Sequence, residues 1–313
     1  MEPRAASSED PIFPGRALWL VAIFGLAAIN ATWLILSPIS IDPQTLVQPL
    51  VFGYVGLLLS YIAWRLKLPR ALLEVPSGLA FILLAWLNLR VLNHLTMSLS
   101  FPLVDEVLAS WDEALGFRWL GYLEWAAARP SFIKVLSMVY VSLTSLSVLV
   151  FLGLYAAGRG NRAQEFILIF FATALATIII GAGFPAKAAI SFHSPQQELL
   201  SALPTGSGVY HLVYLEGLRN DTGHVLTGPL PGLVTFPSLH TAAALVMAYA
   251  CRGMIIAFPL AALYALLMFA ATPLLGGHYF VDLIGGTVLV AVVVATHCIW
   301  RSKIAHPVLA VRA

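Results

Sequence analysis

Long apolar runs separated by short polar stretches dominate the chain and predict membrane-spanning helices. A helix needs about 20 predominantly apolar residues to cross the hydrocarbon core of a bilayer. Such runs cover residues 17–37, 47–65, 71–93, 132–157, 164–184, 254–274 and 279–300, with a shorter one at 238–252. The pattern predicts an all-α polytopic membrane protein with about eight transmembrane helices.

The first of two long connections, residues 94–131, carries a helical pattern. Its apolar positions recur with the period of a helix at Leu103, Val107, Leu108, Trp111, Leu115 and Trp119. The acidic residues fall on other faces, namely Asp105, Glu106, Asp112 and Glu113. This spacing predicts one or two amphipathic helices. They would lie in the membrane interface, where Trp111, Trp119, Tyr122 and Trp125 suit the depth; a helix packed on the protein surface is the alternative.

The second long connection, residues 185–236, is rich in proline and glycine and leads directly into a histidine motif. A polar loop of this length is typical of a lid or a substrate-binding cover. We expect three parts in the chain. They are N-terminal membrane helices (1–93), a catalytic membrane core that includes both long connections (94–304) and a cytoplasmic tail (305–313).

The composition supports a lipid environment and excludes other classes of protein. The 313 residues are 60% hydrophobic and 10% charged, with a mean hydropathy of +0.88. A soluble domain needs far more surface charge. The net charge of +2 and the lack of a basic run argue against a nucleic-acid partner.

Two further features concern the cysteines and the first apolar run. Cys251 and Cys298 lie within or at the end of apolar runs, so both are expected to be packing residues rather than a disulfide or a metal site. The first run is longer than the core of a signal peptide and has no small-residue cleavage site after it. It is expected to be a retained membrane anchor.

The distribution of basic residues predicts the orientation. If the N-terminus is cytoplasmic, the inner segments carry eleven of the 17 Lys and Arg residues. An excess of Lys and Arg marks cytoplasmic loops. We therefore expect an integral protein of a bacterial inner membrane, with both termini in the cytoplasm and both long connections on the periplasmic face.

Candidate chemistry is concentrated in two motifs, "TFPSLHTAAA" at 235–244 and "GGHYFVDLIGG" at 276–286. His278 and Asp282 are four residues apart, so a helix brings them together and the carboxylate orients the imidazole. Ser238 is a plausible helix cap beside His240. Two histidines near helix N-termini suit phosphate, with one attacking phosphorus and the other protonating the leaving oxygen. A local helix-stabilising pair, an interface histidine and a metal site are the alternatives.

These motifs resemble the second and third motifs of the type 2 phosphatidic acid phosphatase superfamily. The superfamily usually shows Pro-Ser-Gly-His and later Ser-Arg-x5-His-x3-Asp, and here Leu239 replaces the glycine. The wording is most similar to the branch of inositol phosphorylceramide synthase and its bacterial relatives, as are "VDEVLASWDEALGF" and "LRND" upstream. The resemblance implies a six-helix core that needs no metal or other cofactor. It also implies His278 as the nucleophile, Asp282 as its orienting carboxylate and His240 as the general acid.

The chain also departs from the superfamily pattern. The first motif, Lys-x6-Arg-Pro, is missing, and "GFPAKAAISFH" at 183–193 stands in its place. Ala271 and Thr272 align with the Ser-Arg of the third motif. We expect Lys187 and Arg219 to replace the missing cations. The candidate substrate-binding or phosphate-binding residues are then Lys187, Arg219, Ser238 and Gly277.

The resemblance implies an enzyme that acts on the phosphate or phospho-head-group of a phospholipid or sphingolipid. Water as the acceptor gives a lipid phosphatase, and an alcohol gives a head-group transferase. A transporter or channel is the first alternative, although its charged groups are expected near mid-membrane. A non-catalytic scaffold is the second, although His240, His278 and Asp282 are all present. A haloperoxidase shares such a site, but those enzymes are soluble.

Overall fold

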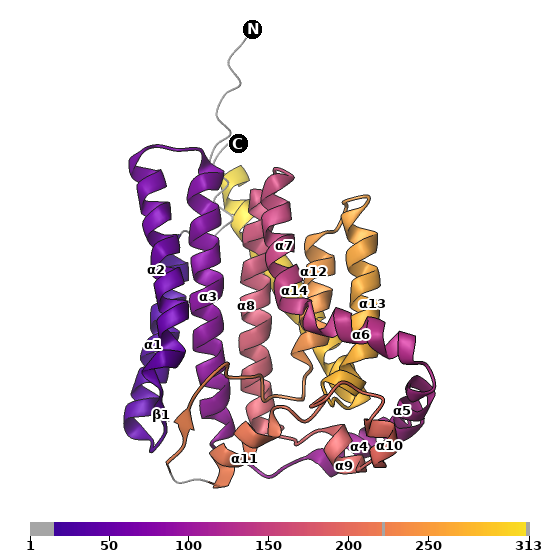
Figure 1. Cartoon of the computed structure of the whole chain (residues 1–313). Coiled ribbons are helices and arrows are strands. Elements are labelled where there is room, and N and C mark those ends of the chain that lie inside the picture. Colours follow the sequence, from indigo (N-terminus) through magenta and orange to yellow (C-terminus); the bar gives the residue numbers. More distant parts are fainter. Residues whose placement is uncertain (1–15, 221–222, 311–313) are drawn as a thin grey trace.

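The computed structural model describes residues 16–220 and 223–310 as a helical bundle with a layer of short segments at one end (Figure 1). Among these residues, six helices are long and apolar enough to cross a membrane. They are α1 (Arg16–Leu36), α2 (Pro43–Arg65), α3 (Arg70–Met97), α8 (Gly160–Gly183), α13 (Ala257–Leu275) and α14 (Phe280–Ala310). The prediction of an all-α integral membrane protein is confirmed in the main, since the elements of the described residues are helices apart from two strands of two residues each.

The number of spans differs from the prediction in two places. The run 132–157 is broken into α6 (Pro130–Val141) and α7 (Leu143–Ala156), which are bent by 57° at the break. In Figure 1, α6 runs obliquely and α7 follows the bundle. The run 238–252 forms α12 (Leu239–Ala250), whose 12 residues are too few for a full span. The described residues therefore hold six helices that could span a membrane, or up to seven spans with the bent pair, and a total of eight remains a prediction.

The two long connections fold together as a layer across one end of the bundle (Figure 1). The first contains α4 (Asp105–Ala114) and α5 (Trp119–Ala127), which confirms the predicted helices. The second contains α9 (Ala189–His193), α10 (Gln197–Leu200), α11 (Leu212–Asn220) and β2 (Val225–Leu226). Strand β1 (Ser40–Ile41) pairs in parallel with β2, so the segment after α1 also holds the second connection.

The opposite end of the bundle contains the predicted inner segments. Helix α1 begins and α14 ends there, and the loops α2–α3, α7–α8 and α12–α13 turn there as well (Figure 1). The structure thus separates the basic loops from the two long connections. The cytoplasmic or periplasmic identity of each end remains a prediction.

Two apolar clusters position the starts of α12 and α14. One joins α3, α7, α8, α12, α13 and α14 inside the bundle, with Phe151, Phe166, Met247 and Met268 among its buried members. The other joins α4, α5, α6 and α13 to residues 186–190, and Tyr279 is buried within it. Helix α3 contributes to the first cluster and contains the predicted domain boundary at residue 93. The N-terminal helices therefore share a core with the rest of the chain.

Three local predictions are wrong. Trp119 and Asp112 are each only 2% exposed, although the pattern placed the first at the membrane interface and the second on a face other than that of the apolar residues. The second connection, the end of α13 and the start of α14 cover α4 and α5, and these contacts decide which faces are buried. Both cysteines are free thiols, and Cys251 is buried as expected, whereas Cys298 is exposed on α14.

Candidate active site

Ser238 joins the start of α12 to the start of α14. Its side chain accepts a hydrogen bond from the Thr241 backbone N–H at 3.4 Å, which confirms the predicted helix cap. The Ser238 backbone N–H donates to the carbonyl oxygen of Asp282 at 2.9 Å. Such a cap stabilises a helix by about 1 kcal/mol. Here the same residue also sets the position of α12 relative to α14.

Two glycines of the second motif allow α14 to approach this segment closely. A Cβ atom on Gly286 would lie 2.5 Å from the carbonyl oxygen of Ser238, and one on Gly285 would lie 2.7 Å from the Phe236 ring. Atoms at these distances overlap, so a larger residue at either position would force this segment to move. The Gly-Gly pair therefore helps to bring the two histidine motifs together.

His278 and Asp282 form the predicted pair. The Nδ1 atom of His278 lies 3.0 Å from Oδ2 of Asp282, which also accepts the Tyr279 backbone N–H at 3.0 Å. His278 is in the turn before α14, not within the helix. When Nδ1–H donates to the carboxylate, the lone pair of the ring is on Nε2. Burial lowers the pKa of His278 to about 4, so the ring is neutral at pH 7 and can act as a nucleophile.

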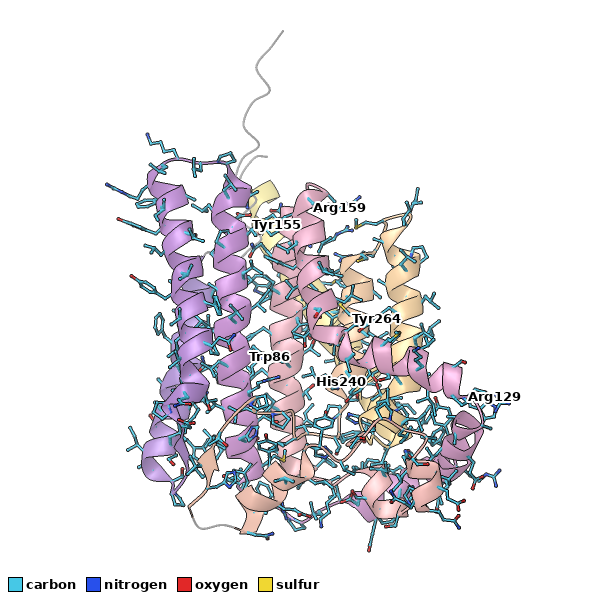
Figure 2. All side chains as sticks on the ribbon, viewed as in Figure 1. Trp86, Arg129, Tyr155, Arg159, His240 and Tyr264 are labelled. Atoms are coloured by element: carbon cyan, nitrogen blue, oxygen red, sulfur yellow. The ribbon has the colours of Figure 1, made fainter. Side chains whose placement is uncertain are left out.

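The structure brings His240 to the same place. The ring centroids of His240 and His278 are 6.4 Å apart at an interplanar angle of 66°. The ring of Tyr140 stacks on His240 at 4.3 Å, and its hydroxyl lies 3.4 Å from that of Tyr210. Figure 2 shows His240 inside the bundle, next to the layer of connecting segments. Sequence reasoning missed Tyr140, since it reaches His240 only because the chain bends after α6.

Gly277 holds the turn before His278 against the second connection. Its φ of +70° is in the left-handed region, and a Cβ atom would lie 2.5 Å from the carbonyl oxygen of Gly208. The Gly277 carbonyl accepts the Ala189 N–H at 2.7 Å, and the Gly208 N–H donates to the Leu275 carbonyl at 2.8 Å. The turn is thus fixed between two parts of the second connection.

A third histidine, His211, lies buried beside this turn. Its Nε2 atom is 2.7 Å from the carbonyl oxygen of Lys187. Burial lowers the pKa of His211 to about 4, and His211 and His278 are near enough to interact electrostatically. No motif in the sequence marked His211, because a single histidine in a polar loop carries no pattern.

Lys187 and Arg219 line one cavity of about 220 Å³, together with Leu103, Leu215, Glu216 and Asn220. The Lys187 ammonium lies 3.2 Å from the Glu216 carboxylate, and Arg219 donates from Nη2 to the Phe101 carbonyl at 3.0 Å. The structure therefore brings the two predicted cations together around one cavity, whose lining does not include His240, His278 or Asp282. A wider groove of about 610 Å³ along α1 contains none of the predicted site residues.

These features define a polytopic helical membrane protein in which two histidines and an aspartate meet at the starts of α12 and α14. A family model described as the PAP2 superfamily matches residues 106–296. The match covers more than half of the chain and includes His240, His278 and Asp282. The chain belongs to the PAP2 superfamily and is a phosphatase-type membrane protein.

Neither a curated protein nor a solved structure matches the chain. The narrower resemblance to the branch of inositol phosphorylceramide synthase remains a prediction. Within residues 16–220 and 223–310, no group of three His, Cys, Asp or Glu side chains is placed to hold a metal ion.

Proposed function

We propose that this protein cleaves a phosphoester bond of a membrane lipid through a covalent intermediate on His278. The observation that carries the proposal is the hydrogen-bonded His278–Asp282 pair with the His240 ring at 6.4 Å. In this arrangement His278, oriented by the carboxylate of Asp282, supplies the nucleophile, and His240 supplies the proton donor.

In the first step, Nε2 of His278 attacks phosphorus and the bond from phosphorus to the leaving oxygen breaks. His240 begins this step protonated, transfers its proton to that oxygen as it leaves, and is then neutral. Asp282 accepts the Nδ1–H of His278 and stabilises the positive charge that develops on the phosphorylated ring. The N–H groups at the start of α12 favour the negative charge of the phosphoryl group.

In the second step, an acceptor oxygen attacks phosphorus, gives its proton to His240 and releases His278. Water as the acceptor makes the protein a lipid phosphatase. A hydroxyl of an alcohol or of a second lipid makes it a head-group transferase.

The cavity of Lys187 and Arg219 supports a polar or anionic head group as the part of the substrate outside the scissile bond. Lys187 links this cavity to the turn of His278, because its carbonyl accepts from His211 and the next residues contact Gly277. Ser238 and Gly277 stand beside the two histidines, and in this proposal they flank the phosphate. The lipid tails remain in the bilayer between the long helices.

The experiment that tests this function follows phosphorus in lipid nanodiscs. Labelled phosphatidic acid, phosphatidylglycerol phosphate and phosphatidylinositol are supplied, with and without ceramide or diacylglycerol. The wild type is compared with His278→Ala. Release of inorganic phosphate by the wild type, and not by the variant, identifies a phosphatase. A new labelled lipid that requires the added alcohol identifies a transferase. No turnover of any of these lipids contradicts the proposal for this set of substrates.

His240→Gln is expected to slow turnover of a lipid phosphate by about 10² to 10⁴-fold, the usual contribution of general acid catalysis. A 4-nitrophenyl phosphate ester has a leaving group that needs no proton, so its cleavage by the variant is expected to remain close to that of the wild type. The measurement compares both substrates in the wild type, His240→Gln and His224→Gln. Equal losses on the two substrates would show that His240 does not protonate the leaving group.

Arg219→Ala is expected to raise KM about tenfold with kcat little changed, because a hydrogen bond to a charged group contributes about 1.5 to 3 kcal/mol. A change confined to KM indicates lost binding of the head group. Arg118→Ala, at an exposed position of the same layer, is the control. An unchanged KM in Arg219→Ala would remove this residue from the substrate site.

A further inference from the structure

Two carboxylates of α4 point into the protein toward the turn that carries His278. Asp105 and Asp112 are seven residues apart, which is about two helical turns and places them on one face. The buried residues Leu108 and Ala109 lie between them on the helix. The neighbouring residues Glu106 and Glu113 are exposed. Helix α4 thus presents one acidic pair to the site and another to the surface.

Asp112 caps the start of α14 from a different part of the chain. Its Oδ2 accepts the Phe280 N–H and its Oδ1 accepts the Val281 N–H, both at 2.8 Å. The first N–H groups of a helix have no partner within the helix and need an acceptor. Burial raises the pKa of Asp112 to about 6, so the carboxylate is ionised at pH 7 and can accept both bonds.

Asp105 joins the second connection to the residue after His278. Its carboxylate accepts the backbone N–H of Lys187 at 3.0 Å and that of Ala188 at 3.2 Å. It also accepts the hydroxyl of Tyr279 at 2.9 Å. Tyr279 in turn donates its backbone N–H to Asp282 at 3.0 Å. A continuous series of hydrogen bonds therefore leads from Asp105 through Tyr279 to the partner of His278.

We propose that Asp105 and Asp112 are positioning residues for the reaction at His278. They hold the segment 278–282 at the depth and rotation that place the imidazole opposite His240. This inference rests on the function proposed above. Both carboxylates act through backbone groups and the Tyr279 hydroxyl.

The geometry predicts which kinetic constant changes. The carboxylates bond to backbone groups and to the Tyr279 hydroxyl, whereas the cations of the cavity proposed for the head group, those of Lys187 and Arg219, bond to Glu216 and to the Phe101 carbonyl. A nucleophile displaced by about 1 Å loses about 10²-fold in rate. Loss of either carboxylate is therefore expected to lower kcat and leave KM nearly unchanged.

The test compares Asp105→Asn with Glu106→Gln, and Asp112→Asn with Glu113→Gln, in full-length protein in lipid nanodiscs. Each pair removes one negative charge from adjacent positions of α4. We expect kcat to fall about 10 to 100-fold in the two Asn variants with KM within about twofold, and no change in the two Gln variants. Tyr279→Phe removes a single hydroxyl and keeps both carboxylates, and a smaller loss of kcat is expected.

Hydrogen–deuterium exchange gives a readout that does not depend on activity. Asp105→Asn is expected to speed exchange in peptides that cover residues 187–188, and Asp112→Asn in peptides that cover residues 280–281. A wild type without phosphoester activity would overturn the proposed function, while exchange would still report on the hydrogen bonds of α4. An active wild type and Asn variants with full kcat, or with kcat lost only together with the folded state, would overturn the positioning role.

Discussion

Replacement of His278 by alanine is expected to abolish the labelled phosphoenzyme and to lower turnover of a lipid phosphate by about 10⁴-fold or more. The variant lacks the only atom that the proposal assigns to attack on phosphorus. When several catalytic residues act together, removal of one of them can lower kcat about as much as removal of all of them. Asp282→Asn is expected to lie between the wild type and His278→Ala, because the amide still occupies the site but carries no charge.

The measurement traps protein-bound label after rapid mixing with ³²P-labelled lipid phosphate. A phosphohistidine is labile in acid and stable in alkali, which distinguishes it from a phosphoserine. His224→Ala, at a histidine of the second connection outside the site, serves as the control. Acid-stable label, or label that persists in His278→Ala, would assign the nucleophile to another residue.

Replacement of Gly277 by alanine is expected to lower activity about 100-fold without loss of the helical bundle. The backbone at this position has a φ of +70°, which costs an alanine about 1 to 2 kcal/mol. The added Cβ atom would also lie 2.5 Å from the Gly208 carbonyl oxygen. The turn must then move away from the second connection, and a displacement of about 1 Å at His278 costs about 10²-fold in rate.

Gly206→Ala separates these two causes. Gly206 has a φ of +79°, and a Cβ atom added there would meet no other atom within 4 Å. The control therefore carries the backbone cost alone and is expected to retain activity within about twofold of the wild type. Activity and thermal stability are measured for both variants in nanodiscs. Similar losses in the two would show that backbone strain, and not contact with Gly208, determines the effect.

Local patterns in the sequence predicted six of the membrane helices and the pairing of His278 with Asp282. Apolar runs of about 20 residues correspond to α1, α2, α3, α8, α13 and α14 because lipid demands such runs whatever the helix contacts. The pair His278 and Asp282 was predictable because residues four apart are neighbours near a helix start. The cap by Ser238 was predictable for the same reason, since both are local geometry.

Features that depend on contacts between distant segments were not predictable in this way. The inward direction of Asp105 and Asp112 depends on the position of α14, more than 160 residues further along the chain. In the sequence, these acidic residues are typical of the solvent-exposed face of an amphipathic helix. Only the structure shows that they accept hydrogen bonds from backbone N–H groups. The stacking of Tyr140 on His240 depends in the same way on the bend of 57° between α6 and α7.

By itself, the sequence determined that this protein lies in a lipid bilayer and that its main elements are helices. It also indicated which chemical groups are candidates for the site. Hydropathy, helical period and capping are properties of short segments, so they can be read without a partner. The tertiary structure alone decided which acidic residues face inward, which tyrosine contacts His240 and where Lys187 and Arg219 come together. Each of these depends on how segments far apart in the chain pack. The local pattern does not distinguish one polar face of a helix from another, and only packing against a distant segment decides which face is buried.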